Sequence, residues 1–97
     1  MGKIDRKFII LAVNPINGKI YTDADGLFFC AKDILVPDML AGYIESGKKH
    51  GADPVHLESM ELARQRVVAF QDAMGGGRIP DTVGGEVARC IFGEGVE

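Results

Sequence analysis

Six side chains in this sequence are candidates for chemistry because of their type and position. They are two cysteines, two histidines, an aspartate and an arginine: Cys30, Asp33, His50, His56, Arg78 and Cys90. Thiolates and imidazoles ligate zinc, and a thiolate beside an imidazole can act as a nucleophile. Either site requires these groups to converge. The spacing does not bring them together by itself, because the sequence contains no Cys-x-x-Cys or His-x-x-x-His pair.

The histidines flank one short connection between two helical segments, so a helical hairpin could bring them near each other. Structural zinc sites normally show paired ligand spacing, which is absent here. We expect His50 to complement the negative end of the first helix and His56 to lie over the first turn of the second, in line with Met60 and Ala63. The sequence therefore predicts neither a metal site nor a cofactor.

Both cysteines lie in mostly apolar surroundings. Cys30 follows two phenylalanines, and Cys90 precedes Ile91-Phe92. A reactive thiol needs a polar, electropositive and partly open setting. Only Arg89, next to Cys90, would contribute to such a setting. We expect both thiols to be reduced, buried and unreactive, and a disulfide only if a third helix returns Cys90 to the strand with Cys30. No residue is assigned a catalytic role, and the sequence favours a protein that is not an enzyme.

Two glycine-containing segments resemble ligand-binding loops but are better explained as a hinge and a tight turn. Gly75-Gly76-Gly77-Arg78 could cradle a phosphate, but phosphate loops follow a strand and open a helix, and this one follows a helix, so we interpret it as a hinge. Asp23-Ala24-Asp25-Gly26 resembles half of a calcium loop, but the twelfth position counted from Asp23 is Ile34 instead of a glutamate. A tight turn explains this segment better.

Composition sets the class of protein. A chain of 97 residues with 46% hydrophobic residues and a net charge of -3 is expected to be one globular domain. A mildly acidic chain is a poor nucleic-acid binder. The longest apolar run, Phe8 to Val13, is too short to span a membrane. No small-residue cleavage site follows it, so we predict a cytoplasmic protein without membrane or nucleic-acid partners.

The N-terminal part shows the pattern of a small antiparallel sheet. Strands are predicted at Phe8–Val13, Lys19–Thr22 and Leu27–Ala31. Asn17-Gly18 favours a first hairpin turn with two successive residues at positive φ. Four residues then suffice for a second reversal, so the simplest order is a meander. The first and third strands are apolar on both faces, which predicts that the C-terminal segment or a second chain covers part of the sheet.

The next part shows the pattern of two helices. The first begins near Asp33 or at Pro37 and ends at Gly51. The second begins at the Asp53-Pro54 cap and runs to Met74. One residue, Ala52, separates Gly51 from that cap, which forces an αα-hairpin. Apolar stripes are predicted on each helix: Val36, Leu40, Tyr43 or Ile44, and Gly47 on the first; Met60, Ala63, Val67, Phe70 and Met74 on the second.

The expected architecture is a single α+β domain over residues 1–97. It comprises a strand-rich half (1–31), the helical hairpin packed on the sheet (32–74), a glycine hinge (75–80), a short C-terminal helix (81–92) and a tail (93–97). Residues 86–92 could instead form a strand. This pattern is typical of an α+β protein whose helices are segregated to one face of the sheet.

One segment carries a resemblance. At Phe29-Cys30-Ala31-Lys32-Asp33, with Val36-Pro37 and Leu40 to Tyr43 after it, the chain resembles small uncharacterised bacterial and prophage-encoded proteins in which a strand runs through Ala-x-Asp into a helix with a Pro and a later Tyr. The resemblance covers Phe8 to Met74. It implies a bacterial, cytoplasmic accessory protein and no particular activity.

Two functions follow as hypotheses. The first is a small non-enzymatic interaction or accessory module that binds a protein partner or a second copy through the sheet side. The alternative is a small enzyme or ligand-binding protein with a site at the strand-to-helix junction, built from Cys30, Asp33 and the histidines. A cleft that holds two or more of these groups would favour the alternative.

Overall fold

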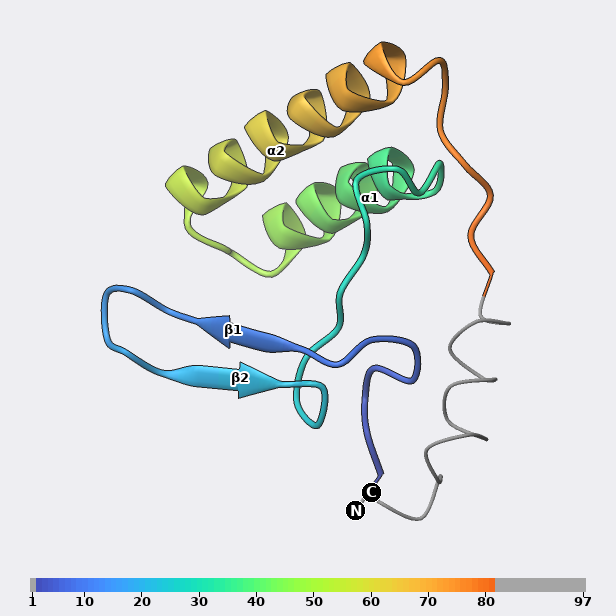
Figure 1. Ribbon diagram of the computed structural model, residues 1–97. Helices are drawn as coiled ribbons and strands as arrows, with labels where there is room; N and C mark the ends of the chain where they lie inside the picture. Colours follow the sequence, from blue (N-terminus) through green and yellow to red (C-terminus); the bar gives the residue numbers. More distant parts are fainter. Residues whose placement is uncertain (1, 82–97) are drawn as a thin grey trace, which may run out of the picture. The chain divides into compact units, whose positions relative to one another are not determined.

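The computed structural model describes residues 2–81, which group into two compact units. Residues 2–28 and Asp81 belong to unit 1, and Phe29–Pro80 forms unit 2. Strands occur in the first and helices in the second (Figure 1). The chain is thus α+β, with one two-stranded antiparallel sheet and two helices among the described residues. The single domain over residues 1–97 stays a prediction.

The sheet of unit 1 is a hairpin of two short strands. Strand β1 is Leu11–Val13 and strand β2 is Ile20–Thr22. All six strand residues are exposed. Because the strands run antiparallel and side chains alternate between faces, opposed residues share a face. The opposed pairs are Leu11 with Thr22, Ala12 with Tyr21, and Val13 with Ile20.

The first turn forms where the sequence predicts it, but with different backbone angles. Asn14 N–H donates to the Lys19 carbonyl (2.8 Å), and Gly18 N–H donates to the Asn14 carbonyl (2.7 Å). Gly18 has a φ of 71°. Asn17 does not share this positive φ, so the expected pair of left-handed residues is wrong. Instead, the Asn17 side chain accepts a hydrogen bond from Lys19 N–H (2.9 Å).

The predicted third strand, Leu27–Ala31, does not form, and the first strand is shorter than expected. Side-chain carboxylates capture the backbone N–H groups that a sheet ladder would need. Phe28 and Phe8 donate to Asp5, and Ile10 donates to Asp23. Asp and Asn side chains compete with secondary structure in this manner. The sheet of about three strands is therefore corrected to two among the described residues.

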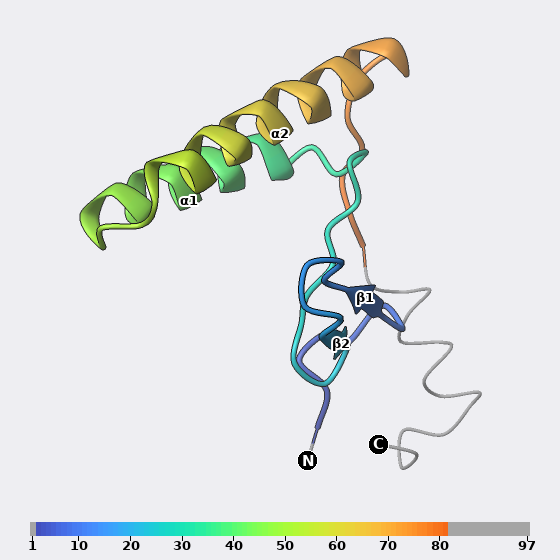
Figure 2. The same ribbon diagram turned by 90° about the vertical axis from the view of Figure 1, so that its left-hand side faces the viewer.

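Unit 2 contains the predicted helical hairpin. Helix α1 is Val36–Lys49 and helix α2 is Pro54–Ala73. They lie side by side in both views (Figures 1 and 2). The α1 start lies between the two predicted positions: the Asp33 carboxylate accepts from Leu35 N–H (2.8 Å) in the turn that precedes the helix.

The connection between the helices follows the sequence prediction closely. Gly51 adopts a φ of 72° after the α1 C-terminus. The Asp53 carboxylate then caps α2 by accepting from Val55 N–H (2.9 Å), and Pro54 is the first residue of the helix. Local residues therefore determine where this hairpin turns, because the left-handed glycine, the cap and the proline all act within one turn.

The core between the helices is small. Val36 and Ile44 are its buried apolar residues on α1, and Leu57 is the one on α2. Gly47 faces Leu57: a Cβ at Gly47 would lie 2.5 Å from a Leu57 methyl carbon. Four of the five residues of the predicted α2 stripe are half-buried, but the fifth, Phe70, is 51% exposed, and Gln71 is buried in its place.

Two remaining predictions concern the chain ends and membranes. Residues 82–92 of the predicted C-terminal helix, and the tail at 93–97, lie outside the described residues. Within residues 2–81, no helix is both long and apolar enough to cross a bilayer.

Candidate functional site

The junction before α1 brings three of the six candidate residues close along the backbone. Asp33 and Arg78 form an isolated parallel β-bridge. Ile34 N–H donates to the Arg78 carbonyl (2.8 Å), and Arg78 N–H donates to the Lys32 carbonyl (2.7 Å). Cys30 is joined to the same junction, because its carbonyl accepts from Asp33 N–H (3.0 Å). The chain before α1 and the chain after α2 are therefore linked side by side.

A buried glutamine holds this junction together. Gln71 is 7% exposed, and its side-chain amide donates to the Ala31 carbonyl (3.0 Å) and the Asp33 carbonyl (2.8 Å). Gly77 lies against it: a Cβ there would lie 2.8 Å from Gln71 Oε1 and 2.9 Å from Ile34. We call Gln71, Gly77 and the Asp33–Arg78 bridge the junction clasp.

The junction clasp leaves little for a bound phosphate. Gly76 N–H donates to the Gln71 carbonyl (2.8 Å), and Arg78 N–H is used in the bridge. The Arg78 guanidinium donates to the Gly76 carbonyl (2.7 Å). Phosphate loops present free backbone N–H groups to their ligand, whereas these are used within the fold. Of the three glycines only Gly77 is closely packed, since Gly75 and Gly76 have open space around them, and the hinge interpretation stays a prediction.

The other reactive groups of the junction are also used locally. The Asp33 carboxylate accepts from Leu35 N–H, so it organises the turn before α1. Cys30 is a free thiol and is only half-buried, where full burial was predicted. The backbones of Cys30, Asp33 and Arg78 meet at the junction. The side chains of Asp33 and Arg78, however, each bind a backbone group two residues away in their own turn.

The two histidines have separate partners. His50 Nδ1 lies 2.9 Å from the Ser46 carbonyl oxygen, which fits the predicted role at the α1 C-terminus. His56 Nε2 lies 2.8 Å from the Tyr43 hydroxyl, and the rings meet edge to face at 5.8 Å. Across residues 2–81, no three His, Cys, Asp or Glu side chains converge in a group that could hold a metal ion. Cys90 lies outside the described residues.

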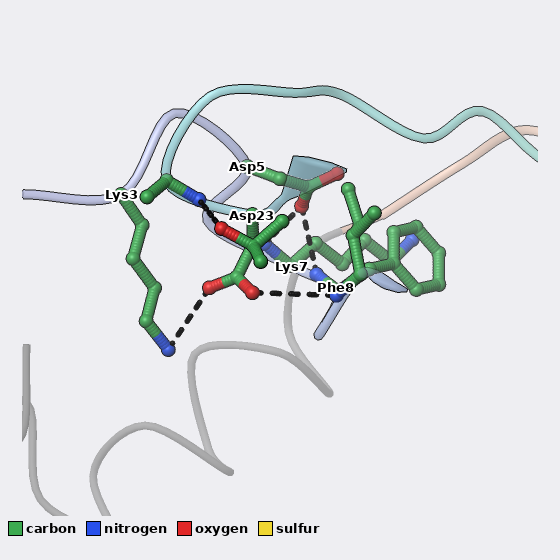
Figure 3. Close-up of polar contacts among 8 residues, drawn as sticks. Lys3, Asp5, Lys7, Phe8 and Asp23 are labelled. Carbon is green, nitrogen blue, oxygen red and sulfur yellow. Dashed lines mark hydrogen bonds and ion pairs between the residues drawn. The ribbon is translucent and has the colours of Figure 1, made fainter. Parts of the chain in front are cut away.

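Two carboxylates in unit 1 form a polar centre that the sequence analysis missed (Figure 3). Asp5 is 3% exposed; Oδ1 accepts from the N–H groups of Lys7 (2.8 Å) and Phe8 (2.7 Å), and Oδ2 accepts from Phe28 N–H (2.8 Å). The Phe8 and Phe28 rings pack edge to face, 5.0 Å apart. Asp5 therefore fastens the segments on both sides of the β-hairpin to one carboxylate.

Asp23 completes this carboxylate centre. Its carboxylate accepts from Ile10 N–H (3.3 Å) and pairs with the Lys3 ammonium (3.2 Å). Its backbone carbonyl accepts from the N–H groups of Ile4 (2.8 Å) and Asp5 (3.0 Å). The calcium-loop interpretation gains nothing from these contacts, because a lysine ammonium occupies one Asp23 oxygen. Asp25 instead accepts from Thr22 N–H (2.8 Å), as the turn interpretation predicts.

Both carboxylates are held ionised. Burial works to raise the pKa of Asp5, but hydrogen bonds from Phe8, Lys7 and Phe28 N–H groups outweigh it and hold the pKa below its ordinary value, despite the negative charge of Asp23. The pKa of Asp23 is lowered mainly by its own N–H and that of Ile10, with Lys3 adding to the shift. A general acid needs a raised pKa, so this pair suits structure better than catalysis.

A local signal for Asp5 exists in the sequence. An aspartate often accepts hydrogen bonds from the N–H groups two and three residues after it, which here belong to Lys7 and Phe8. Its third bond, from Phe28, joins residues 23 positions apart and has no comparable local signal.

Comparison of the chain with protein-family models, curated proteins and solved structures found no match.

Proposed function

We propose that the chain is a small non-enzymatic interaction module that binds a protein partner or a second copy through the face of the β-hairpin. The observation that carries this proposal is the exposure of apolar side chains there. Leu11, Val13 and Ile20 share one face and are 75%, 56% and 56% exposed. Ile9 and Ile16, which flank the strands, are each 91% exposed.

Physical chemistry favours a partner for this face. Removing apolar surface from water contributes roughly 25 cal/mol per Å². Contiguous exposed apolar surface on a protein commonly marks an interaction site. Within residues 2–81 the sheet consists of β1 and β2 alone, so each strand has an outer edge that offers backbone groups for pairing. An added strand or apolar surface would cover the exposed apolar side chains, and an added strand would also pair with the backbone groups at the edge.

The use of the polar side chains also supports a role other than catalysis. Asp5, Asp23, Asp33 and Gln71 bind backbone groups of the fold. The alternative, an enzyme or ligand-binding site at the junction, requires Cys30, Asp33 and a histidine to share a cleft, and His50 and His56 have partners on the helices. A bacterial or prophage origin, suggested by the resemblance, stays a prediction.

The test combines light scattering with partner capture by the full chain. We compare the wild type with the double variant Val13→Thr and Ile20→Thr, which removes apolar surface but keeps β-branched residues in the strands. Ala12→Thr, on the opposite face of the hairpin, is the matched control. Self-association or capture of a protein from the source cells should be lost in the double variant and kept in the control.

Two results would contradict the proposal. One is a strictly monomeric chain at high concentration that captures nothing. The other is association that the double variant leaves unchanged, since the interaction would then depend on another surface or on non-specific adhesion.

A further inference from the structure

Unit 2 contains a groove between its two helices, separate from the β-hairpin face. It has a volume of about 740 Å³, and its lining residues belong to α1, α2 and the turn that joins them. We call this cavity the helical groove. Five apolar residues and four charged residues line it: Ala41, Ile44, Ala52, Pro54 and Leu57; Glu45, Lys48, Glu58 and Glu61.

The charged residues make the groove acidic. Three carboxylates and one ammonium line it, and ion pairs with Lys48 and Arg64 compensate two of the carboxylates, so one negative charge stays unpaired among the described residues. Lys48 pairs with Glu45 (3.1 Å), and Glu61 pairs with Arg64, which lies outside the lining (2.6 Å). Within the described part of the chain, Glu58 is exposed and has no charged partner.

The Glu61 carboxylate is ionised but paired with Arg64, so within residues 2–81 the unpaired negative charge of the groove is that of Glu58. The Arg64 guanidinium, followed by the Gln65 amide, lowers the pKa of Glu61 to about 2. Glu61 is therefore fully ionised at neutral pH. Its pairing with Arg64 also orients the carboxylate, since the two contacts are at 2.8 Å and 2.6 Å.

Two antiparallel helices with an apolar groove between them offer the seat of a third helix, which would complete a three-helix bundle. A helix in such a groove inserts apolar side chains at i, i+3, i+4 and i+7. Charged side chains at the rim select the sign of the flanking residues on the incoming helix. Here the buried Ile44 and Leu57 and the exposed Glu58 line the same groove, so together they specify both parts of a ligand.

We propose that the helical groove binds an amphipathic helix of a partner protein, with apolar side chains against Ile44 and Leu57 and Lys or Arg opposite Glu58. The inference rests on the proposed interaction role but assigns it a second surface and a partner chemistry. Charge argues against the chain's own C-terminal segment as the occupant, because residues 82–97 carry three glutamates and one arginine in sequence. A second copy of the chain, at net -3, is likewise a poor charge match for this groove, whereas the β-hairpin face is apolar.

The test uses two synthetic helical peptides and the full-length ¹⁵N-labelled chain. One peptide has Leu at i, i+3, i+4 and i+7 with Lys at the flanking positions, and the other has Glu in place of each Lys. We expect the Lys peptide to bind at least tenfold more tightly at low salt, with amide shift changes centred on Ala41, Glu45, Ala52 and Glu58. Its affinity should fall as salt rises, because exposed charges are screened.

A charge reversal then tests the role of Glu58. Glu58→Lys should weaken binding of the Lys peptide at least tenfold. Asp72→Lys is the matched control, because it makes the same change of charge on the same helix, 14 residues away and thus about 21 Å along the axis. This control should retain affinity within about twofold. Both positions are exposed, so neither variant removes a core contact.

Three outcomes would overturn the helical groove proposal: equal affinity for both peptides, shift changes centred on another surface, or no binding at millimolar peptide. The β-hairpin variant separates this failure from failure of the proposed function. If capture of a cellular partner is lost in the Val13→Thr and Ile20→Thr variant but survives Glu58→Lys, and no peptide binds, then the interaction role stands and the groove proposal falls.

Discussion

At the residue scale, side chains that bind backbone groups decide much of this structure. Asp5 gathers three N–H donors, and Gln71 donates to two carbonyl oxygens. Both side chains are buried. A buried polar group without a partner costs about 1 to 3 kcal/mol, so such residues tolerate substitution poorly. Substitution of Asp5 therefore tests what stabilises unit 1, and substitution of Gln71 tests what stabilises unit 2.

The pH dependence of unit 1 should depend on Asp5. Because the pKa of Asp5 is lower in the folded chain than its ordinary value of 3.8, its ionisation stabilises the fold above that value. This contribution disappears as the pH falls through the lowered pKa. Asp5→Asn should therefore destabilise unit 1 by about 1 to 3 kcal/mol at pH 7, and the difference from wild type should narrow below pH 4.

Urea titrations at several pH values, followed through the amide NMR signals of Phe8 and Phe28, measure this difference. Asp25→Asn is the control: Asp25 accepts one bond from Thr22, which an asparagine oxygen can also accept, so its effect should stay within about 0.5 kcal/mol. A stability difference for Asp5→Asn that is constant from pH 7 to pH 2 would contradict the assignment.

At the element scale, the helical hairpin depends on how closely its helices approach. Gly47 on α1 leaves room for the Leu57 side chain of α2, whereas an added Cβ would lie 2.5 Å from that side chain. Gly42, also on α1, has no atom within 4 Å of the corresponding position. Glycine is therefore required for packing at position 47. At position 42 it only lowers the helix propensity, because a side chain would fit there.

Substitution of the two glycines should have opposite effects. Gly47→Val should destabilise unit 2 by about 1 to 3 kcal/mol, because Leu57 must move out of a packed interface. Gly42→Ala should stabilise it by about 0.5 to 1 kcal/mol, because alanine has the better helix propensity and meets open space. Urea unfolding followed by circular dichroism at 222 nm measures both. A stabilising Gly47→Val, or a destabilising Gly42→Ala, would show that the helices pack differently.

At the scale of the whole molecule, the described chain is held by separate polar centres in each unit. The carboxylate centre of Asp5 and Asp23 binds segments of unit 1. The junction clasp closes unit 2 by joining the chain before α1 to the chain after α2. The two units should therefore respond separately to changes in these centres.

Gln71→Met tests this separation. Methionine keeps most of the side-chain volume but leaves the Ala31 and Asp33 carbonyls without their donor, which should cost about 2 to 4 kcal/mol in unit 2. Amide hydrogen exchange should show faster exchange at Ile34, Gly76 and Arg78. Exchange at the β1 and β2 amides should be unchanged. Gln65→Met, at an exposed position on α2, is the control. Uniform acceleration across both units would contradict separate responses.

Residues close together in the chain suffice to predict the helical hairpin and the positions of the turns in unit 1. Gly51, Asp53 and Pro54 act through backbone geometry and hydrogen bonds within a few residues, so their effect is visible in the sequence. The predicted roles of His50 at a helix end and of Asp25 in a turn were confirmed for the same reason. The expectation that the chain holds no metal site stays a prediction.

Contacts between distant parts of the chain set which apolar segments form strands and which groups Asp5 and Gln71 bind. Leu27–Ala31 has strand-forming residues, yet its Phe28 N–H binds a carboxylate 23 positions earlier in the chain. Gln71 donates to carbonyls about 40 positions away, and helical periodicity alone favoured Phe70 for the interior. Hydrogen bonds between distant segments form only when folding brings those segments together. A local pattern of residue types contains no information about which distant groups will meet.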